Sequence, residues 1–329
     1  MINNTKTPFQ NLDPNTILSA VETLGYACSG SLIGLNSYEN RVYQIGIEGS
    51  NPLIAKFYRP NRWDNKAILE EHELSLELTD HEIPVIPPII SQNNKTLHEY
   101  NGYRFVVFPR KGGRALDQGN IDQLAWMGRF IGRLHAVSSC KQYFHRSTLN
   151  TETHGYNTYR FLVKNNFIPH YLVTQYSSVV EEILSITDEL FKNITNLKLI
   201  RLHGDCHLGN ILWNVTGPHI VDLDDSEMGP AIQDIWMLLS GNHDQIRSQL
   251  DIILENYCKF YEFDIRELKL IEAMRALRMI QYSAWLANRW EDPAFPISFP
   301  WFNTPHYWEE QLLNLREQVV LLTNSPYYI

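Results

Sequence analysis

The pattern of apolar residues changes once along the chain, and this change constrains the fold more than any other feature. Before residue 110, short runs alternate between apolar and polar residues or are apolar throughout, which is typical of antiparallel strands. After Gly112 and Gly113, most apolar residues recur at helical spacing. We therefore predict an α+β fold with two lobes, a small antiparallel β-sheet lobe at residues 1–110 and a larger, mainly helical lobe at 111–329.

The same periodicity gives the expected elements. Strands are predicted at residues 31–35, 41–47, 53–58, 96–99 and 103–108, and later at 197–202 and 219–223. Helices are predicted from Asp13 to Gly25 and at residues 64–78, 121–137, 174–192, 231–239, 245–260, 266–290 and 305–322. An Asn101-Gly102 pair between two of the strands is a strong signal for a tight hairpin.

The charge balance narrows the range of partners. Net charge is −9 at pH 7, so we expect the chain to bind neither nucleic acid nor an anionic membrane. Residues 1–8 lack the apolar stretch of a signal peptide, no apolar run is long enough to cross a bilayer, and the four cysteines form no Cys-x-x-Cys pair. We therefore expect a cytoplasmic protein. The sequence leaves its oligomeric state open, and a monomer is the simplest expectation.

The strongest chemical signal is the segment 202–210, Leu-His-Gly-Asp-Cys-His-Leu-Gly-Asn, which follows a predicted strand. Its Asp205 and Asn210 are five positions apart, as in the H-R-D-x-x-x-x-N loop of kinases. An aspartate at this point can orient an attacking hydroxyl and accept its proton. An asparagine oxygen one turn later is a hard ligand that suits magnesium. We predict these two roles for Asp205 and Asn210.

A second acidic segment, Ile220-Val221-Asp222-Leu223-Asp224-Asp225, lies a short distance further on. Asp222 ends an apolar run, where kinases place the aspartate that holds magnesium on the nucleotide phosphates. We predict Asp222 as a catalytic residue and, with Asn210, as a metal ligand. The sequence leaves open whether Asp224 also binds the metal, and Asp225 has the character of a helix cap.

A lysine in a short apolar strand supplies the third signal. Leu53-Ile54-Ala55-Lys56-Phe57 resembles the V-A-I-K strand whose lysine pairs with the α- and β-phosphates of ATP. The following helix carries Glu70 and Glu71, either of which can orient Lys56. We favour Glu71, because Leu74 and Leu78 then share its helical register.

The glycine-rich loop of kinases, G-x-G-x-x-G, is missing. The first predicted β-turn instead reads Gly34-Leu35-Asn36-Ser37-Tyr38-Glu39-Asn40. Its backbone N–H groups and the Ser37 hydroxyl can still cradle phosphate oxygens. We therefore include Ser37 with Lys56 and Glu71 in the predicted ATP site.

These motifs resemble the aminoglycoside phosphotransferase and choline kinase superfamily, in which H-G-D-x-H-x-G-N is followed by a hydrophobic-D-x-D strand. Several segments are also similar to bacterial serine/threonine protein kinases of that superfamily: N-S-Y-E-N-R-V-Y, K-F-Y-R-P-x-R-W, R-L-H-G-D-C-H, G-N-I-L-W, V-D-L-D-D and D-P-A-F-P. The resemblance covers nearly the whole chain. It implies a bilobal, protein-kinase-like fold, with nucleotide bound by the N-terminal lobe and catalysis in the C-terminal lobe.

The resemblance also implies an activity. It implies ATP- and Mg²⁺-dependent transfer to serine and threonine hydroxyls of proteins, autophosphorylation and a role in stress responses. Its site residues would be Asp205 as proton acceptor, Asn210 and Asp222 as Mg²⁺ ligands and Ser37 as an ATP contact. Asp234 lies only twelve positions after Asp222, so a long regulatory activation loop is not expected.

Other functions are compatible with the same residues. A small-molecule kinase acting on an amino alcohol, a sugar or an aminoglycoside would use the same loop. A pseudokinase scaffold would bind nucleotide without transferring phosphate. Two further residues have structural interpretations: we expect His135 to be an interior histidine with its hydrogen bonds satisfied, and Asp234 to accept N–H bonds from the loop that carries Asp205.

Overall fold

The computed structural model describes residues 7–324, which form two compact units. The first unit contains the described residues through Asp117 together with Tyr143–Arg146 and His207–Ser226. The second contains Gln118–Gln142, Ser147–Cys206 and the described residues from Glu227 onward. The lobe boundary at residue 110 stays a prediction, and most of the N-terminal segment considered for a signal peptide lies outside the described residues.

A five-stranded antiparallel sheet forms the centre of the first unit, with strand order β1-β2-β3-β5-β4. Its strands are β1 (Cys28–Gly34), β2 (Arg41–Ile47), β3 (Leu53–Phe57), β4 (His98–Tyr100) and β5 (Tyr103–Pro109). All five strands predicted in this part of the chain are confirmed. Asn101 and Gly102 connect β4 to β5 with φ angles of 50° and 80°, which confirms the predicted hairpin.

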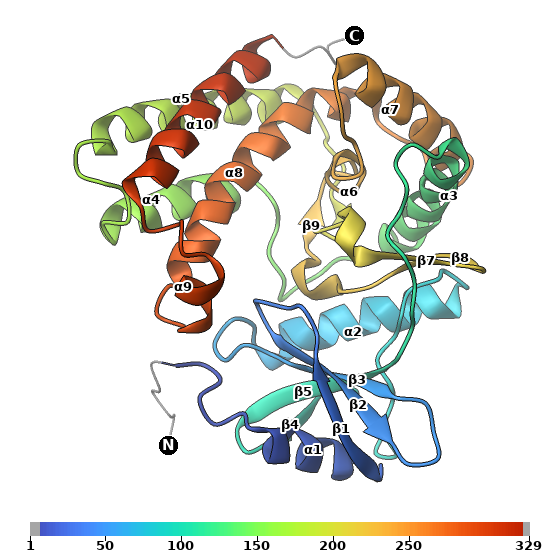
Figure 1. Ribbon diagram of the computed structural model, residues 1–329. Coiled ribbons are helices and arrows are strands. Elements are labelled where there is room, and N and C mark those ends of the chain that lie inside the picture. Colours follow the sequence, from blue (N-terminus) through green and yellow to red (C-terminus); the bar gives the residue numbers. More distant parts are fainter. Residues whose placement is uncertain (1–6, 325–329) are drawn as a thin grey trace. The chain divides into compact units, whose positions relative to one another are not determined.

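Two helices cover opposite faces of this sheet, α1 (Pro14–Glu22) and α2 (Asn65–Asp80) (Figure 1). Each begins at an aspartate whose carboxylate accepts a backbone N–H: Asp13 from Thr16 at 2.7 Å and Asp64 from Ala67 at 2.8 Å. Successive side chains of a strand point to opposite faces. Phe57 on β3 therefore packs with the α1 cluster, whereas Lys56 points toward α2.

A small hairpin completes the first unit and departs from the prediction. It consists of β7 (Ile211–Asn214) and β8 (Gly217–Ile220), flanked by short 3₁₀ turns at Leu208–Asn210 and Leu223–Asp225. The prediction missed β7 and extended the second strand to residue 223. That extension is wrong because Asp222 has a left-handed backbone, with φ of 63°, which ends the strand.

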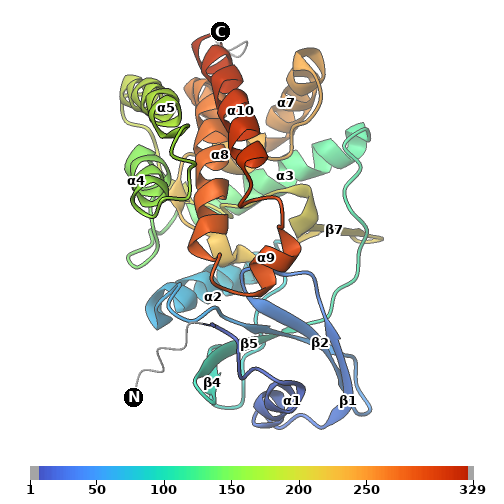
Figure 2. The same ribbon diagram turned by 60° about the vertical axis from the view of Figure 1, so that its left-hand side comes forward.

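Helices dominate the second unit. They are α3 (Ile121–Ser138), α4 (Asn157–Lys164), α5 (Val173–Asn193), α6 (Ile232–Trp236), α7 (His243–Tyr257), α8 (Ile271–Asn288), α9 (Ala294–Ser298) and α10 (Pro305–Thr323). In Figure 2, α8 runs through the middle of this bundle, with α10 along it and α4 and α5 beside them. A two-stranded ladder joins β6 (Ile200–Arg201) to β9 (Met228–Gly229). Within residues 7–324, no helix combines the length and apolar character needed to span a membrane.

The helices predicted in this part are confirmed, with two corrections. The helix expected at 231–239 ends at Trp236, and the one expected from 266 begins as a 3₁₀ turn, Ile265–Leu270. The prediction missed α4 and α9. It also missed β9, whose two residues are too few to show a period.

Close contact between α3 and α7 depends on two glycines four residues apart. A Cβ at Gly128 would lie 2.3 Å from the carbonyl oxygen of Ile253, and one at Gly132 would lie 2.6 Å from that of Tyr257. Larger side chains would therefore push the helices apart. Their approach brings His135 of α3 to the hydroxyl of Tyr257, with a distance of 2.8 Å to Nδ1.

Candidate active site

Lys56 lies at the centre of a buried cluster of charges in the first unit. Its Nζ is 3.1 Å from Glu71 Oε1, 3.1 Å from Asp222 Oδ1 and 3.2 Å from Asp224 Oδ1. Burial disfavours the charged ammonium, but the three carboxylates outweigh this effect and hold the pKa of Lys56 well above its usual value. The lysine is therefore a fixed, permanently charged cation.

The two neighbouring glutamates of α2 have different contacts. Glu71 pairs with Lys56 and also with Arg146, whose Nη2 is 3.2 Å from Glu71 Oε2. Glu70 instead accepts the backbone N–H groups of Phe144, His145 and Arg146 at 2.8 to 3.2 Å. Adjacent residues on a helix point in different directions, so one helix supplies both the lysine partner and an anchor for residues 143–146.

Asp224 is the most heavily bonded carboxylate of the cluster and is 2% exposed. Arg62 pairs with it, Lys56 is 3.2 Å away, and Asn40 Nδ2 donates to it at 3.0 Å. Burial alone would raise the pKa of Asp224, but Arg62, Lys56 and Arg146 reverse that effect and hold it below its ordinary value. Its contacts are those of a structural anchor.

Asp222 differs from Asp224 in exposure. Its side chain is 48% exposed, and only one of its oxygens is at contact distance from Lys56. The β7–β8 hairpin brings Asn210 close to it, because the N–H of Val221 donates to the carbonyl of Asn210 at 3.0 Å. The left-handed backbone of Asp222 is a costly conformation for a non-glycine residue, which is typical of functional positions.

The donor set around Asp222 bears on metal binding. Asp222 and Asn210 offer hard oxygen atoms of the kind that Mg²⁺ prefers. Among residues 7–324, no group of three or more His, Cys, Asp or Glu side chains is arranged to hold a metal ion. Asp222 and Asn210 would supply two oxygen ligands, and Mg²⁺ usually keeps several water or phosphate oxygens besides.

Ser37 lies in the loop between β1 and β2. Its hydroxyl donates to the carbonyl of Asn40 at 3.3 Å, which supports the turn. Asn40 holds this loop in place: besides donating to Asp224, its Oδ1 accepts the N–H of Arg59 at 3.0 Å. The prediction assigned no role to Asn40 or Arg62. Both lie within the segments that carry the family resemblance, and this position was the feature of the sequence that could have indicated a role for them.

Asp205 belongs to the second unit and ends the HGD turn, residues 203–205. Asp234 on α6 holds this turn by accepting the N–H of His203 at 2.7 Å and that of Gly204 at 2.9 Å. The predicted role of Asp234 is thus confirmed. Gly204 has φ of 86°, a conformation that favours glycine, which explains why glycine precedes the aspartate.

Asp234 is itself fixed by a buried histidine. His135 Nε2 is 3.0 Å from its Oδ2, and the other ring nitrogen faces Tyr257, so the predicted interior role of His135 is confirmed. Burial works to raise the pKa of Asp234, but the hydrogen bond and charge of His135 and the bond from His203 lower it overall. The HGD turn therefore rests on an ionised aspartate.

Asp205 has a partner that the sequence did not indicate. Arg278 on α8 places Nη2 2.9 Å from Asp205 Oδ1, and the Asp205 side chain is 21% exposed. The predicted residues thus fall into two sets. Ser37, Lys56, Glu71, Asn210 and Asp222 lie in the first unit, and Asp205 lies in the second.

Comparisons with known proteins show the family of the chain. Residues 31–271 match the model of the phosphotransferase enzyme family. The chain is 43% identical to "Stress response kinase A" of Escherichia coli O157:H7, over 99% of this chain and 98% of the relative. It is 42% identical to "Serine/threonine protein kinase RdoA" of Salmonella typhimurium, over 97% and 96% of the two chains.

Solved structures give the same fold. Amicoumacin kinase hAmiN, in complex with AMP-PNP, Ca²⁺ and Ami, is similar with a TM-score of 0.74. The match covers 96% of this chain and 95% of the other at 19% sequence identity. At that identity the likeness concerns the architecture, which is the predicted α+β, kinase-like fold.

Proposed function

Because the chain belongs to the phosphotransferase enzyme family, we propose that it transfers the γ-phosphate of ATP to serine and threonine hydroxyls of proteins, with Mg²⁺ as its cofactor. The observation that carries this proposal is the contact of Lys56 with both Glu71 and Asp222. Kinases use a lysine–glutamate pair to grip nucleotide phosphates and an aspartate to bind the metal.

The first unit has the charges for this task. Lys56, fixed by Glu71, would bind the α- and β-phosphates, and the loop that contains Ser37 would cover them. Among the described residues, five carboxylates pair with the cations of this cluster (Glu39, Glu71, Asp222, Asp224 and Asp225), and they outnumber Lys56, Arg59, Arg62 and Arg146. A polyanionic nucleotide therefore requires a divalent cation. Mg²⁺ held by Asn210 and Asp222 would supply the missing positive charge.

The second unit supplies the base. Asp205 would orient the acceptor hydroxyl and accept its proton as the oxygen attacks phosphorus. Asp234 would keep the HGD turn in one conformation, so that the carboxylate is positioned before the acceptor binds. Catalysis would then consist of positioning and electrostatic stabilisation, and transfer to the acceptor would pass through no covalent phosphoenzyme intermediate.

The choice of a protein acceptor rests on the relatives. Those at 42–43% identity match over nearly their whole length and are named as a stress response kinase and as a serine/threonine protein kinase. The amicoumacin kinase shares only 19% identity. We propose by extension that the protein phosphorylates itself, acts in a stress response as a cytoplasmic monomer, and binds nucleotide through residues 1–110 and acceptor through 111–329.

Incubation of the purified protein with γ-labelled ATP, Mg²⁺ and a cell lysate tests the proposal. Label is expected in proteins, and acid hydrolysis of those proteins should release phosphoserine and phosphothreonine. The Asp205→Asn variant is the control, because it keeps the shape of the side chain and loses the base. Label found only in small molecules would favour the small-molecule kinase. ATP binding without any transfer would favour the scaffold.

A further inference from the structure

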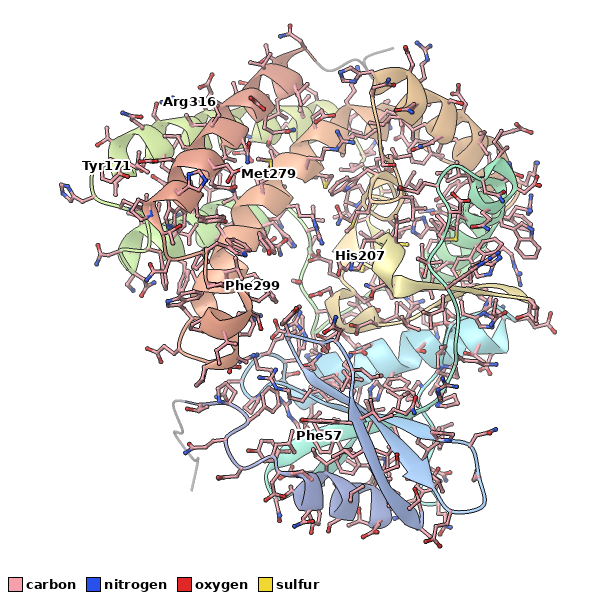
Figure 3. The ribbon with its side chains drawn as sticks, viewed as in Figure 1. Phe57, Tyr171, His207, Met279, Phe299 and Arg316 are labelled. Carbon is pink, nitrogen blue, oxygen red and sulfur yellow. The ribbon has the colours of Figure 1, made fainter. Side chains whose placement is uncertain are left out.

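A cavity of about 390 Å³ lies in the second unit among α6, α8 and α10. Its lining residues are Trp236, Arg275, Arg278, Met279, Tyr282, Gln311, Asn314 and Gln318. Figure 3 labels Met279, a lining residue on α8. It also labels Arg316 on α10, which is not part of the lining. Arg278 both lines this cavity and contacts Asp205, so the cavity adjoins the proposed base.

The charged side chains of the lining are both cationic. The lining contains two arginines, three amides and no carboxylate. The charge of Arg275 is offset by the buried Glu272, whose Oε1 lies 3.1 Å from Arg275 Nη1. Among residues 7–324, the carboxylate that contacts Arg278 is that of Asp205, which is not fully buried, and the Arg278 side chain is 42% exposed.

We propose that this cavity is the acceptor subsite and binds an anionic group, a carboxylate or a phosphate, carried by the polypeptide next to the hydroxyl to be phosphorylated. The inference rests on the proposed function and specifies its substrate. A guanidinium has five N–H donors in a planar fork, so Arg278 can contact Asp205 with one edge and an acceptor anion with the other. The rigid guanidinium of Arg278 would therefore set the distance between the anionic group of the substrate and the hydroxyl that Asp205 orients.

The lining also disfavours a cationic acceptor. An amino alcohol or an aminoglycoside would bring an ammonium group beside Arg278 and find no carboxylate in the lining to pair with it. Trp236, Met279 and Tyr282 offer apolar surface on which a peptide backbone can lie. An acidic or already phosphorylated peptide segment satisfies both the arginine and this apolar surface.

A set of matched peptides tests the subsite. Each peptide has one serine followed by glutamate, phosphoserine, glutamine or lysine, and kcat and KM are measured for the wild type and for Arg278→Glu. The wild type should show the lowest KM for the glutamate or the phosphoserine peptide. The comparison of these two peptides identifies which anion is preferred. In Arg278→Glu, the KM of both anionic peptides should rise roughly 10- to 100-fold and that of the lysine peptide should fall.

Arg316→Glu is the matched control. Arg316 lies on α10 in the same unit, is exposed, and contacts Gln175 Oε1 at 3.1 Å. The variant makes the same change of charge away from the cavity, so its peptide preference should equal that of the wild type. Both variants should keep the wild-type KM for ATP.

Three results would overturn the inference. In the first, Arg278→Glu lowers kcat equally for all four peptides and leaves their KM ratios unchanged, so that Arg278 only braces Asp205. In the second, the wild type prefers the lysine peptide. In the third, the wild type labels no peptide, which defeats the proposed protein kinase activity itself and the subsite with it.

Discussion

In each unit a buried aspartate accompanies an accessible one in the candidate site, but the two buried aspartates are held in different ways. Asp224 and Asp234 are 2% and 1% exposed, whereas the side chains of Asp222 and Asp205 are 48% and 21% exposed. Asp224 is surrounded by cationic side chains, chiefly Arg62 and Lys56. Asp234 instead accepts backbone N–H groups and faces a histidine.

The difference indicates which part of the candidate site each buried aspartate holds in place. Asp224 fixes the positions of long, charged side chains, so its neighbourhood determines the charge offered to a nucleotide. Asp234 fixes the backbone of the HGD turn, so it determines the direction in which Asp205 points. Removing one member of a buried ion pair leaves an uncompensated charge, which typically costs about 3–5 kcal/mol. Removing a backbone acceptor loosens one turn at a smaller cost.

The largest effect on phosphoryl transfer is expected at Asp205, the accessible aspartate of the second unit. Asp205→Ala removes the proposed proton acceptor and should lower kcat by roughly 10³-fold, while the Kd for ATP stays near the wild-type value. Steady-state assays and calorimetry measure the two quantities. Asp251→Ala on α7, an exposed aspartate of the same unit, is the control. Wild-type turnover in Asp205→Ala would remove Asp205 from the mechanism.

Lys56→Met should have the next largest effect, because it removes the cation at the centre of the first cluster. The value of kcat/KM should fall by roughly 10²- to 10³-fold, since the ammonium would stabilise charge on the transferring phosphate. The free energy of unfolding should fall by about 3 kcal/mol, because Glu71 and Asp224 lose a buried partner. Activity assays and urea unfolding measure the two losses.

A double-mutant cycle separates the two roles of Lys56. Adding Glu71→Gln to Lys56→Met removes a carboxylate that has lost its partner, and it should restore part of the stability but none of the activity. Lys66→Met, an exposed lysine at the start of α2, is the matched control. If the double variant were no more stable than Lys56→Met, the Lys56–Glu71 contact would not account for the loss.

Asp222→Ala tests the accessible aspartate of the first unit. Nucleotide binding in the presence of Mg²⁺ should weaken by roughly 10²-fold, whereas binding without metal should change little. Stability should be nearly unchanged, because this side chain is half exposed. Calorimetry with and without Mg²⁺ gives both affinities. Asp225→Ala changes another exposed aspartate nearby, and an equal loss in that variant would assign the metal dependence to the segment and not to Asp222.

Local patterns in the sequence were sufficient to predict much of this arrangement. Strand alternation around Lys56 and helical register at Glu71 depend on neighbours in the chain. The partners of Arg62 and Arg278 do not. Arg62 and Asp224 are 162 positions apart, and an arginine gives no sign in the sequence of which carboxylate it will meet. The same holds for the two residues of β9, which pair with β6 from a separate part of the chain.

Asp234→Asn should have a moderate effect on transfer. An asparagine has one acceptor oxygen where the aspartate has two, so one of the N–H groups of His203 and Gly204 would face an NH₂ group. We expect kcat to fall roughly tenfold and the free energy of unfolding to fall by about 1–3 kcal/mol, with an unchanged KM for ATP. Asp188→Asn on α5 is the control. A change in KM for ATP alone would contradict a role in orienting Asp205.

Glu267→Gln should affect transfer least and instead change the pH dependence of stability. Glu267 is 3% exposed and accepts the N–H of Ile232, the first residue of the helix that carries Asp234, at 2.9 Å. Burial raises the pKa of Glu267 from 4.5 to about 7. Between these pH values the folded state keeps a proton that the unfolded chain has lost, so wild-type stability should fall as pH rises through this range.

Glutamine does not titrate, so urea unfolding at several values from pH 5 to pH 8 should show the variant gaining about 2 kcal/mol relative to the wild type. The exposed Glu262→Gln should parallel the wild type, and a parallel curve for Glu267→Gln would show that this carboxyl is already ionised below pH 5.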